Sequence, residues 1–157
     1  MQVSILVRRC LIGVQEVHLS AVYCAQEDSR RALVYIPHLL PTETVNLAAR
    51  ANPSAGLRYA SNRIDPETLE HCAREKPWAA LEYAAELLTP ETLDWAAREK
   101  PWAAVVYAAK HLSPATLDWA AQMFPEVSFR FAREYLAPET RIRCANLAII
   151  NTLTVID

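Results

Sequence analysis

Apolar residues recur at helical spacing along short segments of this chain, and prolines bound those segments. In residues 66–75, for example, Leu69, Cys72 and Ala73 fall on one narrow face, because each helical residue turns the chain by about 100°. Polar side chains occupy the opposite face, which is the pattern of an amphipathic helix with one buried side. The pattern therefore predicts short helices that pack through a stripe of small residues.

The pattern repeats every 24 residues, as two consecutive stretches make plain. Sixteen of the 24 positions are identical between PETLEHCAREKPWAALEYAAELLT (66–89) and PETLDWAAREKPWAAVVYAAKHLS (90–113). The same register covers further copies at 18–41, 42–65 and 114–137, and a partial copy at 138–157. Residues 1–17 match poorly, and we expect them to form an N-terminal cap on a single domain spanning 18–157. We predict an all-α fold, an α-solenoid of stacked 24-residue helix-turn-helix repeats.

Prolines predict where the two helices of each copy begin, since proline is favoured at the first position of a helix. The expected first helices begin at Pro66, Pro90, Pro114 and Pro138, and the expected second helices at Pro53, Pro77, Pro101 and Pro125. Asp65, Thr89 and Ser113 each precede a first helix and are good N-cap residues. Helices of about ten residues are marginal alone in water, so stacking must stabilise them.

The second helix is apolar nearly all round. Trp78, Leu81, Ala84, Ala85 and Leu88 form one apolar face, and Ala79, Ala80, Tyr83 and Leu87 form another. A helix of this kind is usually buried on both sides. We therefore expect the tyrosine column of the repeats to lie in the core: Tyr35, Tyr59, Tyr83, Tyr107 and Phe131.

One repeat position breaks the polar face of the first helix. This position, the first-helix column, is occupied by Tyr23, Leu47, His71, Trp95, Trp119 and Arg143. Tryptophan, tyrosine and arginine are enriched at binding hot spots, which favours recognition of a partner. Packing in the groove between adjacent first helices explains the same residues about equally well. The partner-binding candidates are this column, except Leu47, and four flanking charges: Glu67, Arg74, Glu91 and Arg98.

Composition and charge narrow the functional classes. The 157 residues suit one domain, and the net charge of −2 lacks the basic excess expected of a nucleic-acid-binding protein. Residues 66–113 carry eight acidic residues against five Lys/Arg, so a phosphate backbone is disfavoured there. No apolar run approaches the length of a membrane span. Arg8 and Arg9 interrupt the N-terminal apolar stretch before it could form a secretion signal.

The sequence predicts neither a catalytic site, a metal site nor a cofactor. The four histidines occupy different repeat positions, and two glycines cannot build a phosphate-binding loop. The four cysteines form no CxxC pair. Cys24, Cys72 and Cys144 share a repeat position where other copies have alanine, which predicts small, buried, unreactive side chains; Cys10 stays unassigned. We expect a non-enzymatic cytoplasmic protein with reduced thiols.

The phrases ALEYAAELL and LRYAS, set in this period over residues 18–140, resemble an uncharacterised bacterial helical-repeat family with "ALxYAS"-like short helices. The chain departs from that pattern by placing Pro-Trp at 77–78 and 101–102, and by starting both helices of a copy with proline. The resemblance implies tandem short helices and a bacterial, phage or pathogen-effector setting. It implies no activity and no catalytic residues.

Our leading hypothesis is a module that occupies a protein partner's surface, as a small inhibitor, an immunity or anti-defence protein, or an effector regulator. The alternative is a helical repeat that binds single-stranded RNA by base stacking on the first-helix column. Mimicry of nucleic acid by an acidic ridge is a weaker third possibility, because Arg and Lys are interspersed there. The apolar segment 147–156 predicts a cap on the repeats or a contact between copies of the chain.

Overall fold

The computed structural model of the chain describes residues 23, 25 and 27–154, with side chains as far as residue 149. The described residues contain helices and no strands, so the predicted all-α fold class is confirmed for them. They divide into two compact units, an N-terminal unit of residues 1–72 and a C-terminal unit of residues 73–157. The predicted cap at 1–17, with Cys10, lies outside the described residues, as does Cys24.

Among the described residues of the N-terminal unit, three helices before α5 (Pro66–Glu75) pack on one another. They are α2 (Ser29–Tyr35), α3 (Thr42–Ala51) and α4 (Pro53–Ala60), with a 3-10 turn η1 (Pro37–Leu39) between the first two. Helix α2 contacts both α3 and α4, and α3 contacts α4. The unit ends within α5, the next first helix of the sequence register.

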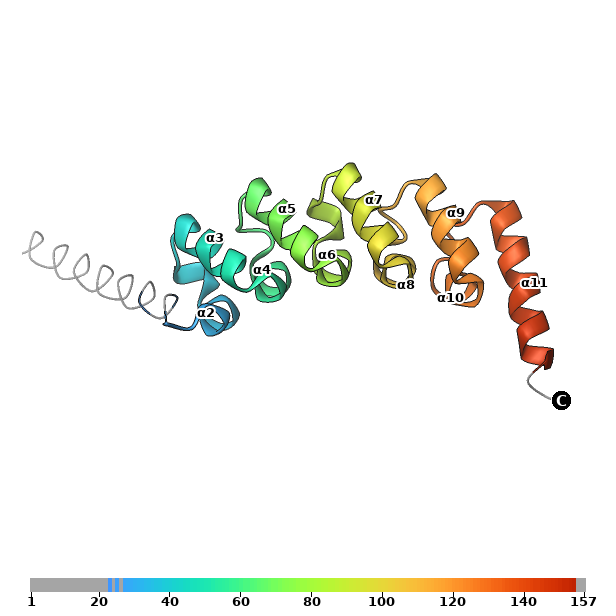
Figure 1. Ribbon diagram of the computed structural model, residues 1–157, viewed down its shortest axis with the longest axis horizontal. Helices are drawn as coiled ribbons and strands as arrows, with labels where there is room; N and C mark the ends of the chain where they lie inside the picture. The colour runs from blue at the N-terminus through green and yellow to red at the C-terminus, as the bar shows by residue number, and fades with distance from the viewer. Residues whose placement is uncertain (1–22, 24, 26, 155–157) are drawn as a thin grey trace, which may run out of the picture. The chain divides into compact units, whose positions relative to one another are not determined.

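In the C-terminal unit, first and second helices of the register alternate along the chain and form two layers. Helices α7 (Pro90–Glu99), α9 (Pro114–Met123) and α11 (Pro138–Thr154) lie side by side as one layer (Figure 1). The second layer comprises α6 (Pro77–Tyr83) with the 3-10 turn η2 (Ala85–Leu87), α8 (Pro101–Ala103) continued by the π-helical segment η3 (Ala104–Ala108), and α10 (Pro125–Phe131). Segment η3 contacts α6 and α10 within this layer and α9 in the other.

The prolines mark the helix starts as predicted. Every expected start from Pro53 to Pro138 is the first residue of a helix. The residues before Pro53, Pro77, Pro101 and Pro125 share φ near −137° and ψ between 65° and 74°. Steric conflict with the proline ring excludes the helical region there, so one residue suffices to turn the chain between two helices.

The predicted N-cap residues cap their first helices with side-chain hydrogen bonds. The Thr89 and Ser113 hydroxyls accept hydrogen bonds from the backbone N–H groups of Thr92 and Thr116, at 3.3 and 3.2 Å. A carboxylate oxygen of Asp65 accepts one from the N–H of Thr68 at 2.6 Å. Such caps satisfy donors that have no partner within the helix.

The core is a set of small residues and leucines that recur at the same repeat positions. The predicted first-helix stripe is buried at Leu69, Cys72 and Ala73 and at the equivalent residues of α3, α7 and α9. In α11 only Cys144 of this stripe is buried, and Arg141 is exposed. From the second helices, Leu33, Leu57, Leu81 and Val105 are fully buried. A carbon placed on Gly56 would lie 2.6 Å from Ala49 Cβ, so α3 and α4 approach too closely there for any side chain.

The expectation that the tyrosine column lies in the core is wrong. Tyr35 is 73% exposed, Tyr59, Tyr107 and Phe131 are also exposed, and Tyr83 is half-buried. Trp78 and Leu87, which we placed on buried faces, are each 43% exposed. Alanines, Gly56 and leucines such as Leu81 fill the inner side of the second helices, and the aromatic rings lie at the edge of this packing. A helical wheel gives a direction around the axis, but it does not show which sides a neighbouring helix covers.

Candidate partner-binding site

The first-helix column is largely exposed in the described residues. Leu47 on α3 is 71% exposed, and Trp119 on α9 is 38% exposed. His71 and Arg143 are exposed, Tyr23 is exposed, and Trp95 is half-buried. Within the C-terminal unit the column places Trp95, Trp119 and Arg143 on the neighbouring helices α7, α9 and α11.

In the N-terminal unit, an arginine of one first helix contacts the start of the next first helix. Arg50 of α3 reaches α5, where its Nη2 lies 2.9 Å from Glu67 Oε1 and its Nε donates to Thr68 Oγ1 at 3.2 Å. Glu67 remains 86% exposed, so this ion pair is a surface contact with a small effect on stability. The contact shows how an arginine at this repeat position binds a carboxylate and a threonine hydroxyl together.

The equivalent arginines of the C-terminal unit have different neighbours. The Arg74 guanidinium lies 6.0 Å from the centroid of the Trp95 ring, within the range of a cation–π contact. Arg98 lines a surface cavity of about 490 Å³ together with Ala115, Thr116 and Trp119. We call this the Arg98 cavity. Of the predicted flanking charges, Glu67 pairs with an arginine, whereas Glu91 is exposed and has no ion pair with a described residue.

A second aromatic surface, which we did not predict, lies on the second helices of the C-terminal unit. Four rings meet edge to face, and we call them the aromatic network: Trp78, Tyr83, Trp102 and Tyr107. Trp78 lies 6.4 Å from Tyr83 and 6.0 Å from Tyr107, and Tyr107 lies 6.2 Å from Trp102, between ring centroids. Both tryptophans are 43% exposed. The recurring Pro-Trp pair was the sequence signal that could have drawn attention to this surface.

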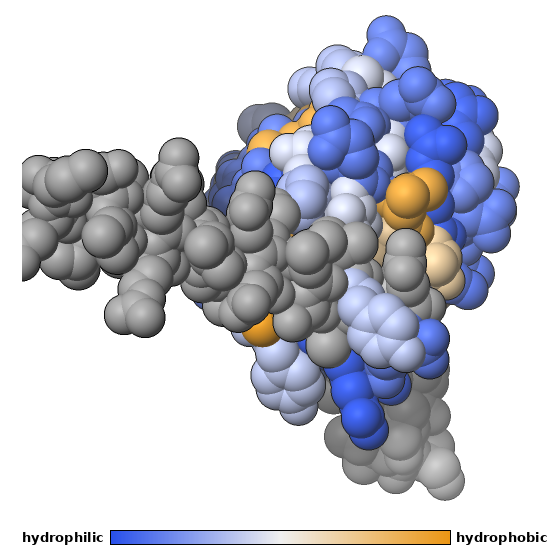
Figure 2. Space-filling view, turned by 90° about the vertical axis from the view of Figure 1, so that its left-hand side faces the viewer, coloured by the Kyte–Doolittle hydropathy of each residue, from blue (hydrophilic) through white to orange (hydrophobic). Residues whose placement is uncertain are grey.

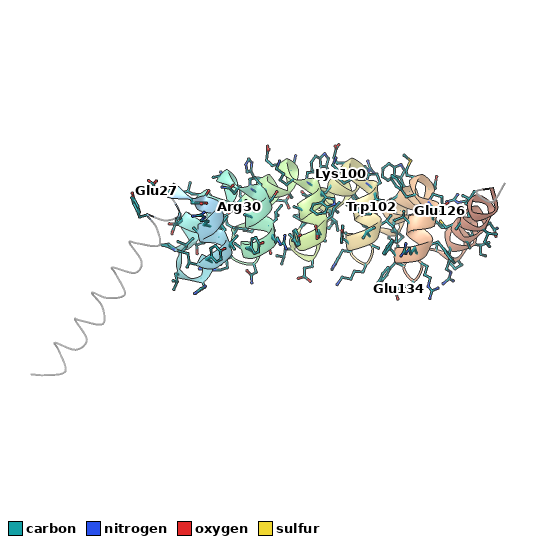
Figure 3. All side chains as sticks on the ribbon, turned by 90° about the horizontal axis from the view of Figure 1, so that it is seen from below. Glu27, Arg30, Lys100, Trp102, Glu126 and Glu134 are labelled. Atoms are coloured by element: carbon teal, nitrogen blue, oxygen red, sulfur yellow. The ribbon has the colours of Figure 1, made fainter. Side chains whose placement is uncertain are left out.

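In the copy after Trp102, the tryptophan of the aromatic network is replaced by a glutamate. Trp102 on α8 and Glu126 on α10 occupy the same repeat position, and both are labelled in Figure 3. The Arg130 guanidinium lies 5.2 Å from the centroid of the Phe131 ring on α10. Charged residues therefore border the rings on this side, as they border the apolar centre of many interfaces.

Other exposed apolar side chains include Tyr35, Leu47 and Ile142. Figure 2 shows the side of the molecule that is on the left in Figure 1, and its described surface is mostly hydrophilic with small separate hydrophobic areas. Single exposed apolar side chains are ordinary on protein surfaces, whereas connected groups mark interaction sites.

The two described cysteines are buried and occupy equivalent places. Cys72 Sγ lies 3.5 Å from the carbonyl oxygen of Ala49, and Cys144 Sγ lies 3.8 Å from that of Ala121. Burial raises the pKa of the Cys144 thiol above its ordinary value, which disfavours the reactive thiolate. The small, buried role predicted for this column therefore fits both described cysteines.

The described residues contain no group of three or more His, Cys, Asp or Glu side chains placed to hold a metal ion. Across the same part of the chain, every helix is too short or too polar to cross a membrane.

Asp65 is the carboxylate whose titration the fold changes most clearly. It caps α5, and its backbone N–H donates to Asn46 Oδ1 at 3.0 Å while its second carboxylate oxygen accepts from Asn46 Nδ2. The hydrogen bond from the Thr68 backbone lowers the pKa of Asp65 below its ordinary value. Partial burial acts in the opposite direction, and the positive charge of Arg50 lowers the pKa further. Asp65 therefore links α3 to α5 and does not resemble a general acid or base.

Comparison with known proteins assigns no family. No protein-family model, curated protein sequence or solved structure matches the chain.

Proposed function

We propose that this chain is a non-catalytic protein-binding module, an α-solenoid of 24-residue helix pairs that occupies the surface of a partner protein. It acts in the cytoplasm as a small inhibitor, an immunity or anti-defence protein, or an effector regulator. The observation that carries the proposal is the exposed aromatic network of the C-terminal unit.

The rings of the aromatic network suit partner binding because their positions are already fixed. Edge-to-face pairs contribute about 0.5–1.5 kcal/mol beyond their buried area, so each ring restrains its neighbour. Side chains that are ordered before binding lose less conformational entropy on association. Trp and Tyr are also the residue types that dominate measured hot spots.

The same rings lie at the edge of the core and leave a large part of their surface exposed. Leu81 and Ala80 are fully buried in α6, whereas Trp78 of the same helix leaves 43% of its surface exposed. Retaining two exposed tryptophans at equivalent positions carries an aggregation risk unless a partner covers them. A partner that buries the network would explain their presence.

The experiment is capture of partners from the source organism's lysate, with and without nuclease, read by mass spectrometry. The test variant is Trp78→Ala/Trp102→Ala, and Trp95→Ala/Trp119→Ala tests the first-helix column. Leu47→Ala, which removes a 71% exposed apolar side chain from the N-terminal unit, is the matched control. Circular dichroism checks that each variant keeps its helicity.

We expect one near-stoichiometric protein that survives nuclease, is retained by Leu47→Ala and is lost with Trp78→Ala/Trp102→Ala. Loss only with Trp95→Ala/Trp119→Ala would move the binding surface to the first-helix column. A partner that vanishes with nuclease would favour the single-stranded RNA alternative. A partner retained by both double variants would overturn the proposed surface.

A further inference from the structure

The Arg98 cavity occupies the same register positions as the Arg50 ion pair, with alanine in place of the glutamate. Arg98, Ala115 and Thr116 lie two 24-residue periods after Arg50, Glu67 and Thr68, at the same repeat positions. In both places the arginine belongs to one first helix and the other residues begin the next. The N-terminal unit therefore serves as a template for what the cavity can hold.

Arg98 has lost the partner that Arg50 has. Ala115 ends at its Cβ, so it cannot reach a guanidinium as Glu67 does. Arg98 forms no ion pair with any residue in the described part of the chain, and its side chain is exposed. A guanidinium offers five N–H donors in a planar fork that matches a carboxylate.

The walls of the cavity suit a carboxylate on a short apolar stem. Thr116 is buried, with 5% of its surface exposed. It is the equivalent of Thr68, whose hydroxyl oxygen accepts a hydrogen bond from Arg50 Nε. Trp119, which replaces His71 of the template, supplies an aromatic wall that remains 38% exposed. Methylene groups of an acidic side chain can pack on such a ring while the charge meets the arginine.

We propose that the Arg98 cavity binds a glutamate side chain of a partner protein, which takes the place that Glu67 occupies beside Arg50. A carboxylate suits the surroundings better than a nucleic-acid backbone does. Residues 90–121 carry three Lys/Arg and four Asp/Glu, and phosphate backbones are bound by several cations together. The site lies on first helices α7 and α9, so the inference is independent of the aromatic network on the second helices.

The test titrates the whole chain with the blocked peptide acetyl-Pro-Glu-Thr-Leu-amide, which has the sequence of residues 66–69. Nuclear magnetic resonance follows the Trp119 indole N–H and the Arg98 Nε–H. The same peptide with Gln in place of Glu is the neutral control. Acetate tests a free carboxylate, and inorganic phosphate tests the nucleic-acid alternative.

Two variants remove the site in opposite ways. Arg98→Gln removes the charge, and glutamine already occupies this repeat position at Gln122. Ala115→Glu restores the template's own carboxylate, which should fill the cavity and shift the Arg98 Nε–H without any peptide. Arg74→Gln, at the equivalent position beside Trp95, is the matched control. All three positions are exposed, so each variant should keep its helicity.

We expect a saturable shift of both resonances by the Glu peptide, at least about tenfold weaker for the Gln peptide, as loss of a charge-assisted hydrogen bond predicts. The shift should disappear in Arg98→Gln and Ala115→Glu and persist in Arg74→Gln. No saturable shift, or equal affinity for the Gln peptide, would overturn the inference. Tighter binding of phosphate would reassign the cavity to a phosphate group, and acetate binding as tightly as the peptide would exclude a protein source. None of these outcomes depends on whether Trp78 and Trp102 bind a partner.

Discussion

In the N-terminal unit, polar side chains join one helix to the next, whereas in the C-terminal unit Ala115 takes the place of Glu67 and exposed tryptophans lie on the helices. Asn46 binds Asp65, and Arg50 binds Glu67 and Thr68. Arg63 donates to the carbonyl oxygens of Pro37 and Leu40. In the C-terminal unit, Ser113 and Asp94 make the counterpart of the Asn46–Asp65 contact at a longer 3.5 Å.

The comparison separates residues that maintain the fold from residues that are free to bind. Both units bury the same positions of the 24-residue register, so the packing is shared. Their exposed positions differ in chemistry, and the C-terminal unit retains an unpaired arginine and exposed tryptophans. The shared positions of the register therefore support the helices, while its exposed positions vary in chemistry between the units.

The largest expected effect tests whether the packing is shared. Leu57 and Leu81 occupy equivalent, fully buried positions in the two units. Leu57→Ala and Leu81→Ala should each lower the free energy of unfolding by about 2–5 kcal/mol, through lost burial and the cavity left behind. Chemical denaturation followed by circular dichroism measures both. A loss below about 1 kcal/mol in one unit alone would contradict a common core.

Gly56 provides the next largest effect, and it concerns a difference between the units. Gly56→Ala should lower the free energy of unfolding by about 1–3 kcal/mol, because the added carbon meets Ala49 Cβ at 2.6 Å. Alanine is otherwise preferred to glycine within a helix by about 1 kcal/mol. Ala80 occupies the equivalent position of α6, where the helices accommodate a methyl group. A stabilised Gly56→Ala variant, measured by thermal denaturation, would mean that α3 and α4 can separate without cost.

A smaller effect is expected from the cap of α9. Ser113→Ala should lower the free energy of unfolding by about 1 kcal/mol, since the Thr116 N–H loses its acceptor. Ala137 occupies the same repeat position before α11. Ala137→Ser should therefore raise the free energy of unfolding by several tenths of a kcal/mol. Denaturation of both single variants and of the double variant measures the pair. Equal stability of Ser113→Ala and the wild-type chain would show that the observed hydrogen bond does not stabilise α9.

The smallest effect is the pH dependence that Asp65 contributes. Its pKa is lower in the folded chain than in the unfolded chain, so the stabilisation is complete above about pH 5 and is lost as the pH falls through the folded value. Asp65→Asn keeps a capping oxygen but does not titrate. The stability difference between the two proteins should therefore shrink from about pH 5 to about pH 2. A constant difference across that range would mean that Asp65 titrates alike in both states.

The sequence by itself determined the helices and their inner faces. Proline fixes φ and excludes a helical conformation at the preceding residue, so Pro53, Pro77 and Pro101 set helix starts locally. The leucine and alanine spacing identified the buried stripe, because one face of a short amphipathic helix must be covered. These features depend on neighbours within one helical turn.

Only the tertiary structure decided which large side chains stay outside and which arginine lacks a partner. The sequence pattern predicts burial for Tyr107 and Trp102 as it does for Leu81, yet their rings lie at the edge of the packing and stay partly exposed. The Arg98 cavity depends on Ala115, which is far along the chain and on another helix. Exposure and pairing arise from contacts between helices, and the periodicity of a single helix cannot specify them.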